Sequence, residues 1–344
     1  MEHVAIDLGG RESQVCVRTS DGTIVEERRW LTASLERYLQ KRPQSRVIVE
    51  TSSEAFAVAD GAIRCGHEVR VVPATLVRSL GVGARGIKTD IRDARVLSEV
   101  SCRIDLPSVH VCSQRSRELK SMCAARGVLI TSRTKLINNV RGWLRTKLLR
   151  IRTGGTVSFA QRVRDKLLKD EDGLPLFIER LLFMIEELTA QIHDASKEIE
   201  EQARSDEECR RLMTVPGIGP QTSVRFRAAI DDLSRFAGAH AVESYLGLTP
   251  GERSSSTKVH RTGITKAGAK AVRHLLIQAA WCAWRTRRSD PMVQWAIRLA
   301  DRRGRFVAIV ALARKMAGIL YAIWRDGSTY DPSKGASQPK VSEL

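Results

Sequence analysis

The succession of strands and helices in the first 110 residues constrains the fold most strongly. The first strand, Val4–Gly10, is apolar and ends in Asp7 and two glycines. The next two stretches alternate apolar and polar residues, with a hairpin turn at Asp21-Gly22 between them. The pattern predicts strands at Val4–Gly10, Gln14–Arg18, Thr23–Glu27, Arg46–Thr51 and Glu68–Pro73, and helices at Leu35–Gln40, Glu54–Cys65 and Asp90–Val100. Three antiparallel strands followed by helix, strand, helix, strand and helix are typical of an RNase H-like (RuvC-like) α/β domain.

Four carboxylates occupy special positions in this pattern. Asp7 and Glu50 end two of the strands, and Asp90 and Asp93 lie three residues apart on one helix face. Separately they have ordinary explanations: Asp7 as a turn residue, Glu50 as a strand end, Asp90 as a helix cap and Asp93 as a solvated first-turn acid. Strand-end carboxylates in such a sheet converge with acids from a later helix, however. Together the four predict a cluster that can hold two hard divalent cations, as in phosphodiester chemistry.

The charge of the chain indicates a polyanionic partner. The formal net charge is +18 and the isoelectric point is about 10.1, and such proteins bind phosphates with release of counterions. By residue count, the net charge is +1 over residues 1–110, +12 over 111–170, −8 over 171–210 and +13 over 211–344. One cluster alone could be a solvated face, but two large basic blocks favour nucleic acid.

Other sequence features indicate a cytoplasmic protein that does not enter the membrane. The seven cysteines are scattered without a CxxC pair, so we expect reduced thiols and neither a zinc site nor disulfides. We find no signal peptide and expect no apolar run long enough to span a membrane.

The middle of the chain is predicted to form a helical arm. Ser113–Arg150 reads as one long basic helix with an apolar seam, suited to tracking a phosphate backbone. Its candidate nucleic-acid contacts are Arg133, Lys135, Arg141, Arg145 and Lys147. A second helix repeats apolar residues at alternating steps of three and four, at Ile178, Leu181, Ile185, Leu188, Ile192, Ala195 and Ile199. This coiled-coil seam could pack on the basic helix or on another subunit; we expect an antiparallel hairpin that also supports oligomerisation.

Two motifs follow in the C-terminal block. Leu212–Thr222 resembles a helix-hairpin-helix motif, in which the backbone N–H groups around Gly217 and Gly219 could bind a phosphate; the alternative is a tight interhelical turn. Further on, the run Ser254-Ser255-Ser256 lies among Arg253, Lys258, Arg261, Lys266 and Arg273. This segment could be a flexible loop or could present a nucleophilic hydroxyl, although no activating base is identifiable from the sequence.

These stretches in this order resemble the insertion-sequence 110 family of transposases. The resemblance runs from about residue 3 to about residue 285, and no single motif carries it. It rests on VAIDLGG (4–10), VIVETSS (47–53), GHEVRVVP (66–73), KTDIRDA (88–94), LMTVPGIGPQTS (212–223) and YLGLTPGERSSSTKVHRTGITKAGAKAVR (245–273).

The resemblance implies three parts: a RuvC-like DEDD domain (1–110), a basic coiled-coil arm (111–205) and a transposase domain with helix-hairpin-helix and serine loop (206–325). The composition of residues 326–344, rich in Gly, Ser, Pro and Lys, predicts a flexible tail as a fourth part. It assigns Asp7, Glu50, Asp90 and Asp93 to Mg²⁺ binding. It also points to Ser255 as the catalytic serine. Family members often have Ser-Ser-Gly-Gly at this place, whereas Ser256-Thr257 stands here, so Ser254 and Ser256 stay open as alternatives.

By the same resemblance the protein is expected to be a recombinase. It would excise and insert its element in donor and target DNA through a phosphoserine–DNA intermediate, guided by a structured non-coding RNA. Dimers or tetramers would combine the DEDD residues of one subunit with the serine of another, in a cytoplasmic, nucleoid-associated protein. One alternative is a metal-dependent Holliday-junction nuclease that hydrolyses with water, and another is a non-catalytic DNA-binding protein. Four carboxylates argue against the last, because each repels phosphate unless a metal lies between.

Overall fold

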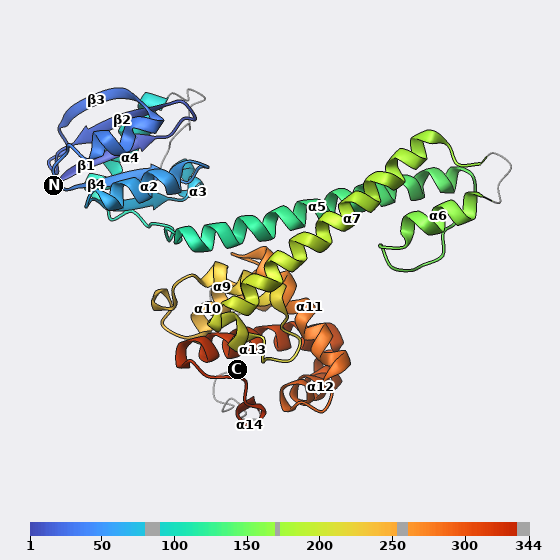
Figure 1. Ribbon diagram of the computed structural model, residues 1–344. Coiled ribbons are helices and arrows are strands. Elements are labelled where there is room, and N and C mark those ends of the chain that lie inside the picture. Colours follow the sequence, from blue (N-terminus) through green and yellow to red (C-terminus); the bar gives the residue numbers. More distant parts are fainter. Residues whose placement is uncertain (80–89, 169–172, 253–260, 336–344) are drawn as a thin grey trace. The chain divides into compact units, whose positions relative to one another are not determined.

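A computed structural model describes residues 1–79, 90–168, 173–252 and 261–335, with Arg78, Ser79, Arg261, Lys334 and Gly335 described by their backbone alone. The chain divides into two compact units, Met1–Ser113 and Gln114–Leu344 (Figure 1). Each unit is described by itself below. The boundaries of the four predicted parts stay a prediction.

The first unit is built on a five-stranded sheet in the order β3-β2-β1-β4-β5. The strands β1 (Glu2–Asp7), β2 (Glu12–Arg18) and β3 (Ile24–Leu31) are antiparallel, whereas β4 (Ser45–Glu50) and β5 (Glu68–Val72) continue the sheet in parallel with β1. All five predicted strands are therefore present in the predicted order. The arrangement is that of an RuvC-like domain.

Helices cover both faces of this sheet. One face, with Val4, Ile6 and Val49, packs under α1 (Leu35–Leu39) and α2 (Ala55–Arg64). The other face, with Ala5 and Ile48, packs under α4 (Asp90–Arg103) and α3 (Ala74–Ser79). Because side chains alternate along a strand, Asp7 shares the α4 face with Ala5, and Glu50 shares it with Ile48. The short helix α3 was not predicted, because its six residues carry no full turn-to-turn apolar repeat.

The second unit begins with two long helices that pack side by side (Figure 1). They are α5 (Gln114–Thr146) and α7 (Leu176–Ser205), and α6 (Phe159–Leu167), which was not predicted, packs on α7. Leu119 near the start of α5 meets Ile199 near the end of α7, while Leu144 meets Ile178. The two helices are therefore antiparallel, as the hairpin prediction required.

The apolar seam of α7 is only partly the one predicted. One row of the seam is buried and consists of the isoleucines Ile178, Ile185, Ile192 and Ile199. In the second row Leu182 is fully buried, whereas the predicted Leu181 is half-buried. A coiled coil and its role in oligomerisation stay predictions.

The rest of the second unit is a helical bundle with one small hairpin of strands. Leu276, Leu312, Met316 and Leu320 are among the residues of its core. The elements are α8 (Glu207–Leu212), α9 (Pro220–Ile230), α10 (Ala239–Tyr245), β6 (Pro250–Glu252), β7 (Arg261–Ile264), α11 (Lys270–Thr286), α12 (Pro291–Arg303), α13 (Arg305–Asp326) and α14 (Pro332–Gly335), with single-turn 3-10 helices at Thr32–Ser34 and Leu233–Arg235.

Helix α13 corrects the expectation that no apolar run could span a membrane. Its 22 residues are long and apolar enough to do so by composition. However, Leu312, Met316 and Leu320 lie in the bundle core with no exposed surface. Burial inside the protein therefore accounts for its hydrophobicity.

The first part of the expected tail is packed against the bundle. The backbone N–H of Tyr330 donates to Thr214 Oγ1 at 2.8 Å, and its hydroxyl donates to Asp290 Oδ1 at 2.8 Å. Residues 336–344 lie outside the described part of the chain.

Candidate functional site

The carboxylates of Asp7 and Glu50 lie at the same edge of the sheet. The strands β1 and β4 are parallel neighbours with Ile6 paired to Val49, so the next residue of each strand is Asp7 or Glu50. Both side chains are on the face covered by α4. Adjacent strands are about 4.8 Å apart, which makes these two residues direct neighbours.

Helix α4 brings Asp90 and Asp93 to this edge, because it runs antiparallel to β1. His3 Nδ1 is 2.8 Å from Ser101 Oγ near the end of α4. The four residues from His3 to Asp7 span about 13 Å of strand. The eight residues from Ser101 back to Asp93 span about 12 Å of helix. Asp93 is therefore level with Asp7, and the structure places all four predicted carboxylates at one end of the sheet.

Polar contacts across the sheet hold α4 in this register. The Arg95 guanidinium binds both carboxylate oxygens of Glu27 on β3, with contacts of 2.7–3.1 Å. Arg18 Nε donates to Ser98 Oγ at 3.0 Å. Burial, and next the charge of Arg46, lower the pKa of His3 below its ordinary value, so the bond to Ser101 is made by a neutral ring. These contacts fix the helix sideways as well as along its axis.

The loop after Asp7 also has a defined shape. A Cβ on Gly9 would lie 2.3 Å from the carbonyl oxygen of Glu12, so only glycine fits there. Thr32 Oγ1 donates to the Gly9 carbonyl at 2.6 Å, and Ser13 Oγ accepts from the Gly9 N–H at 3.3 Å. The glycine that follows the first strand in sequence therefore shapes the backbone next to Asp7.

The four carboxylates differ in environment. Asp93 is 3% exposed, whereas Asp90 is exposed and lies 3.9 Å from Arg29 of β3. Arg29 was not predicted as a neighbour of the carboxylates. Its position follows from the strand register, in which Arg29 pairs with Gln14 and Gln14 pairs with Asp7. Among the described residues, no three of the four carboxylates have oxygen atoms all within 4.8 Å of one another.

The donor set fits a hard cation. All four side chains offer oxygen ligands only, which suits Mg²⁺, Mn²⁺ or Ca²⁺ rather than a thiophilic metal. Negative charges gathered at one edge repel each other unless a cation lies among them. The donor atoms of the four side chains therefore suit a divalent cation.

In the second unit, the strands β6 and β7 flank the predicted serine loop. Ser254, Ser255 and Ser256, with Arg253 and Lys258, lie outside the described residues, and Arg261 is the first residue of β7. Lys266 is exposed just beyond β7 and has a left-handed backbone, with φ +57°.

Arg273 has a different role from the one predicted. It was expected among the cations around the serines, but it is 8% exposed and donates to the carbonyls of Leu246 and Ala267 at 2.8 and 2.7 Å. It therefore ties the segment before β6 to the segment after β7. Two glycines allow the same close approach, since a Cβ on Gly247 would meet Ala267 O and one on Gly268 would meet Tyr245 O.

The predicted phosphate-binding turn joins α8 to α9. Gly217 has φ +85°, and a Cβ there would lie 2.3 Å from the carbonyl oxygen of Ala279. Gly219 caps the N-terminus of α9 in an extended conformation and has open space where a Cβ would be. A cavity of about 720 Å³ lies at this turn and is also lined by Arg287 and Tyr330. The turn is tight, and a helix-hairpin-helix role for it stays a prediction.

The predicted cations of the arm are not equivalent. Lys135, Arg141 and Arg145 are exposed. Arg133 is half-buried and donates to Thr189 Oγ1 of α7 at 3.2 Å. Lys147 lies over the Trp143 ring, with Nζ 5.4 Å from the centroid. The first three are available to a ligand, whereas the last two also serve the packing of the hairpin.

Comparison with known proteins now identifies the class. An RuvC-like domain with carboxylates at one edge of its sheet, in a chain that also has a basic helical unit, is the arrangement of a DNA-processing enzyme. Residues 4–148 match the DEDD transposase domain of IS110 elements, and residues 209–294 match the transposase family described as IS116/IS110/IS902. The protein is therefore a transposase of an insertion sequence that acts on DNA.

Individual relatives establish the family. The chain is 30% identical to the transposase of element IS1111A from Coxiella burnetii, over 71% of this chain and 68% of that one. It is 28% identical to a probable family 20 transposase of Pseudomonas aeruginosa, over 96% and 99%. It is also 32% identical to the pilin gene-inverting protein of Moraxella bovis, over 35% and 38%. The chain belongs to the IS110 family of transposases.

Proposed function

We propose that this transposase is a recombinase that excises and inserts its element by strand exchange through a phosphoserine–DNA intermediate. The observation that carries the proposal is the gathering of Asp7, Glu50, Asp90 and Asp93 at one edge of the sheet. The similarity to a protein named for DNA inversion supports recombination, since inversion requires broken ends to be rejoined in a new order.

The four carboxylates would hold Mg²⁺, at a two-ion site. When bound, the ions stabilise charge on the attacking and leaving oxygens of a phosphodiester. The contribution of the chain is positional: the sheet fixes Asp7 and Glu50, and α4 supplies Asp90 and Asp93 from its first turn. Asp93, at 3% exposure, holds its carboxylate in a fixed direction, whereas Asp90 can exchange its partner Arg29 for a ligand.

We propose Ser255 as the nucleophile. Its Oγ would form a bond to phosphorus as the bond to one DNA oxygen breaks, and that oxygen would leave as a hydroxyl after gaining a proton. A second DNA hydroxyl would then displace the serine, so that no external energy source is needed. Arg253, Lys258, Arg261 and Lys266 would stabilise the phosphate charge.

The rest of the molecule would bind the substrates. Exposed cations of the arm and the turn at Gly217 and Gly219 would contact donor and target DNA and a non-coding guide RNA, and the charge of +18 suits such a load. We further propose a coiled-coil dimer or tetramer, with the DEDD residues of one subunit acting with the serine of another. The protein would work in the cytoplasm at the nucleoid.

A covalent-adduct assay tests the proposal. Purified protein, its co-expressed element-end RNA, Mg²⁺ and labelled donor DNA are resolved on a denaturing gel. The wild type is expected to give a labelled, protease-sensitive adduct that Ser255→Ala abolishes, with Ser254→Ala and Ser256→Ala as matched controls. Asp93→Ala should lose cleavage but keep DNA binding. Asp60→Ala, on the opposite face of the sheet, should keep both cleavage and DNA binding.

The same gel separates the alternatives. Cleaved DNA without an adduct would establish hydrolysis and hence a junction nuclease. If the adduct persists in Ser255→Ala and is lost in either Ser254→Ala or Ser256→Ala, the serine whose replacement abolishes it is the nucleophile.

A further inference from the structure

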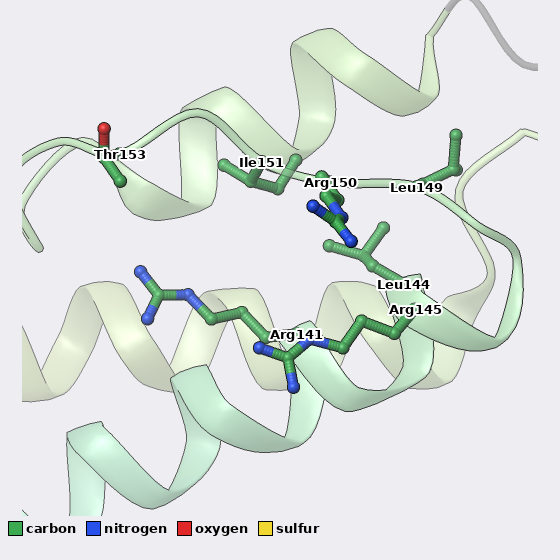
Figure 2. A pocket seen from close by; sticks show the side chains of 7 residues that line it. All are labelled: Arg141, Leu144, Arg145, Leu149, Arg150, Ile151 and Thr153. Carbon is green, nitrogen blue, oxygen red and sulfur yellow. The ribbon is translucent and has the colours of Figure 1, made fainter.

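The far end of the α5–α7 hairpin contains a pocket that the proposed mechanism does not use. Figure 2 shows Arg141 and Arg145 on α5, with Leu149, Arg150, Ile151 and Thr153 in the loop that follows this helix. The pocket has a volume of about 420 Å³ and is lined by Arg141, Leu144, Arg145, Leu149, Arg150, Ile151 and Thr153. Arg150 was not among the predicted contacts, because the sequence alone does not show that its loop turns back over the helix.

The lining has an excess of positive charge. Three of its seven residues are arginines and none is acidic. Within the described part of the chain, no ion pair is found for Arg141, Arg145 or Arg150. Nearby, by contrast, Arg164 is neutralised by Glu179 and Glu186 at 2.7 and 2.6 Å. Three like charges around one hollow repel each other, which an anionic ligand would relieve.

The floor of the pocket is apolar. Leu144 is 1% exposed, and Leu149 and Ile151 pack half-buried against the same core cluster. Arg141 is also held in place, since its guanidinium carbon is 5.4 Å from the centre of the Phe159 ring. A flat apolar group inside the pocket would therefore contact leucine and isoleucine on one side and guanidinium planes on another.

A strained turn builds the wall. Leu148 is 93% exposed and has φ +59°, a left-handed conformation that is unfavourable for a non-glycine residue. This turn lets the N–H of Leu149 donate back to the Leu144 carbonyl at 2.9 Å, which folds the loop over the end of α5. Strain of this kind persists where the shape it produces is used.

We propose that this pocket binds one unstacked nucleotide of the nucleic acid that the transposase carries. The guanidinium groups would bind its phosphate and stack on its base, and the apolar floor would contact the other face of the base. Tracking a duplex backbone needs a charged surface but no hollow with an apolar floor. This inference rests on the proposed function only in that nucleic acid is the ligand.

The position of the pocket indicates a holding role. Along α5, Leu144 at the pocket and Leu119 beside the bundle are separated by about 37 Å of helix. A nucleotide held at the far end is therefore remote from the hairpin that flanks the serines. The pocket would fix the orientation of a looped or bulged RNA or DNA whose other part reaches the bundle.

Binding of bulged and fully paired duplexes tests the proposal. The full chain is titrated with fluorescent RNA, DNA and hybrid duplexes, each with and without a single-nucleotide bulge. The wild type is expected to bind at least one bulged duplex about tenfold more tightly than its paired form. The type of duplex with the largest ratio of bulged to paired affinity identifies the source of the nucleotide.

Two variants of the same loop separate the pocket from general electrostatics. Arg150→Ala removes a lining arginine, and Arg152→Ala removes an exposed arginine of the same loop that does not line the pocket. Arg150→Ala should bring the ratio of bulged to paired affinity close to one. Arg152→Ala should weaken both duplexes equally and keep the ratio. Both side chains are exposed, so an unchanged melting temperature is expected for each.

Three outcomes decide between the pocket and the proposed function. If the wild type does not prefer the bulged form of the RNA, DNA or hybrid duplex, the pocket proposal is wrong, even if the same protein forms the serine adduct normally. Equal loss of the ratio in both variants also overturns it. A bulge preference lost only in Arg150→Ala establishes the pocket, even if no serine adduct is ever found.

Discussion

At the scale of single residues, the Asp206 carboxylate connects three helices of the second unit. It is 5% exposed, accepts the N–H of Cys209 at 2.9 Å as the cap of α8, and pairs with Arg115 of α5 at 2.8 Å. Arg227 of α9 lies 3.9 Å away. Asp206→Asn keeps a capping oxygen and loses the charge, and we expect a loss of about 2 kcal/mol in the free energy of unfolding. Asp206→Ala should lose about 1 kcal/mol more with the cap. Urea denaturation measures both.

The pH dependence of this stability checks the assignment. Burial alone raises the pKa of Asp206, but the Cys209 N–H and the charges of Arg227 and Arg115 outweigh it, so the pKa lies below the ordinary 3.8. A carboxyl with a depressed pKa stabilises the fold above its unfolded value, and this stabilisation is lost as pH falls through the folded value. The difference between wild type and Asp206→Asn should therefore disappear in acid. An undiminished difference at low pH would show that the charge is not its cause.

Residue types alone located some site residues and misplaced others. The positions of Asp7 and Glu50 were predictable, because a carboxylate that ends a strand lies at the edge of the sheet. Arg273 was misplaced because a cation near the serines in sequence looks the same whether it faces phosphate or two buried carbonyls. The difference depends on the left-handed Gly247 and Gly268, whose neighbours are distant in sequence.

At the scale of elements, the position of α4 depends on a histidine that should be sensitive to acid. Burial and Arg46 lower the pKa of His3 below 6.5. A depressed histidine pKa means that stability is complete above 6.5 and falls as the pH drops from 6.5 toward the folded value, because only the unfolded chain takes up the proton in this range. Hydrogen exchange of the α4 amides should therefore speed up as pH falls below this value, beyond the intrinsic pH effect. His3→Gln, which can still bond to Ser101, should remove this extra acceleration; Asp60→Ala serves as the control and should retain it.

Elements were predictable where the apolar period was regular. The strands of the sheet and the buried isoleucine row of α7 follow simple periods of two and seven residues. By contrast, α6 and the loop from Leu149 to Thr153 depend on the left-handed turn at Leu148. A leucine in the sequence does not predict a positive φ. The pocket formed by that loop was therefore beyond prediction.

At the scale of the whole molecule, charge and chemistry are divided between two units. The four carboxylates gather in a unit of near-neutral charge, while the net positive charge lies in the chain from Gln114 onward. A metal site in the middle of a strongly basic surface would have its cations compete with the metal for the carboxylates. Placing carboxylates and excess positive charge in separate units avoids that competition. Under the proposed function it would also let a second chain supply the nucleophile.

Mixing two inactive proteins tests whether the proposed active site is shared between subunits. Asp93→Ala and Ser255→Ala are each expected to form no adduct. In a symmetric dimer whose sites combine two subunits, a mixed dimer has one site with both defects and one site with neither. Equal co-expression makes half the dimers mixed, so the adduct should return to about a quarter of the wild-type yield. A mixture of Asp93→Ala with the double mutant Asp93→Ala/Ser255→Ala is the matched control and should stay inactive. If the first mixture is equally inactive although native mass spectrometry shows mixed dimers, each subunit must use its own serine with its own carboxylates.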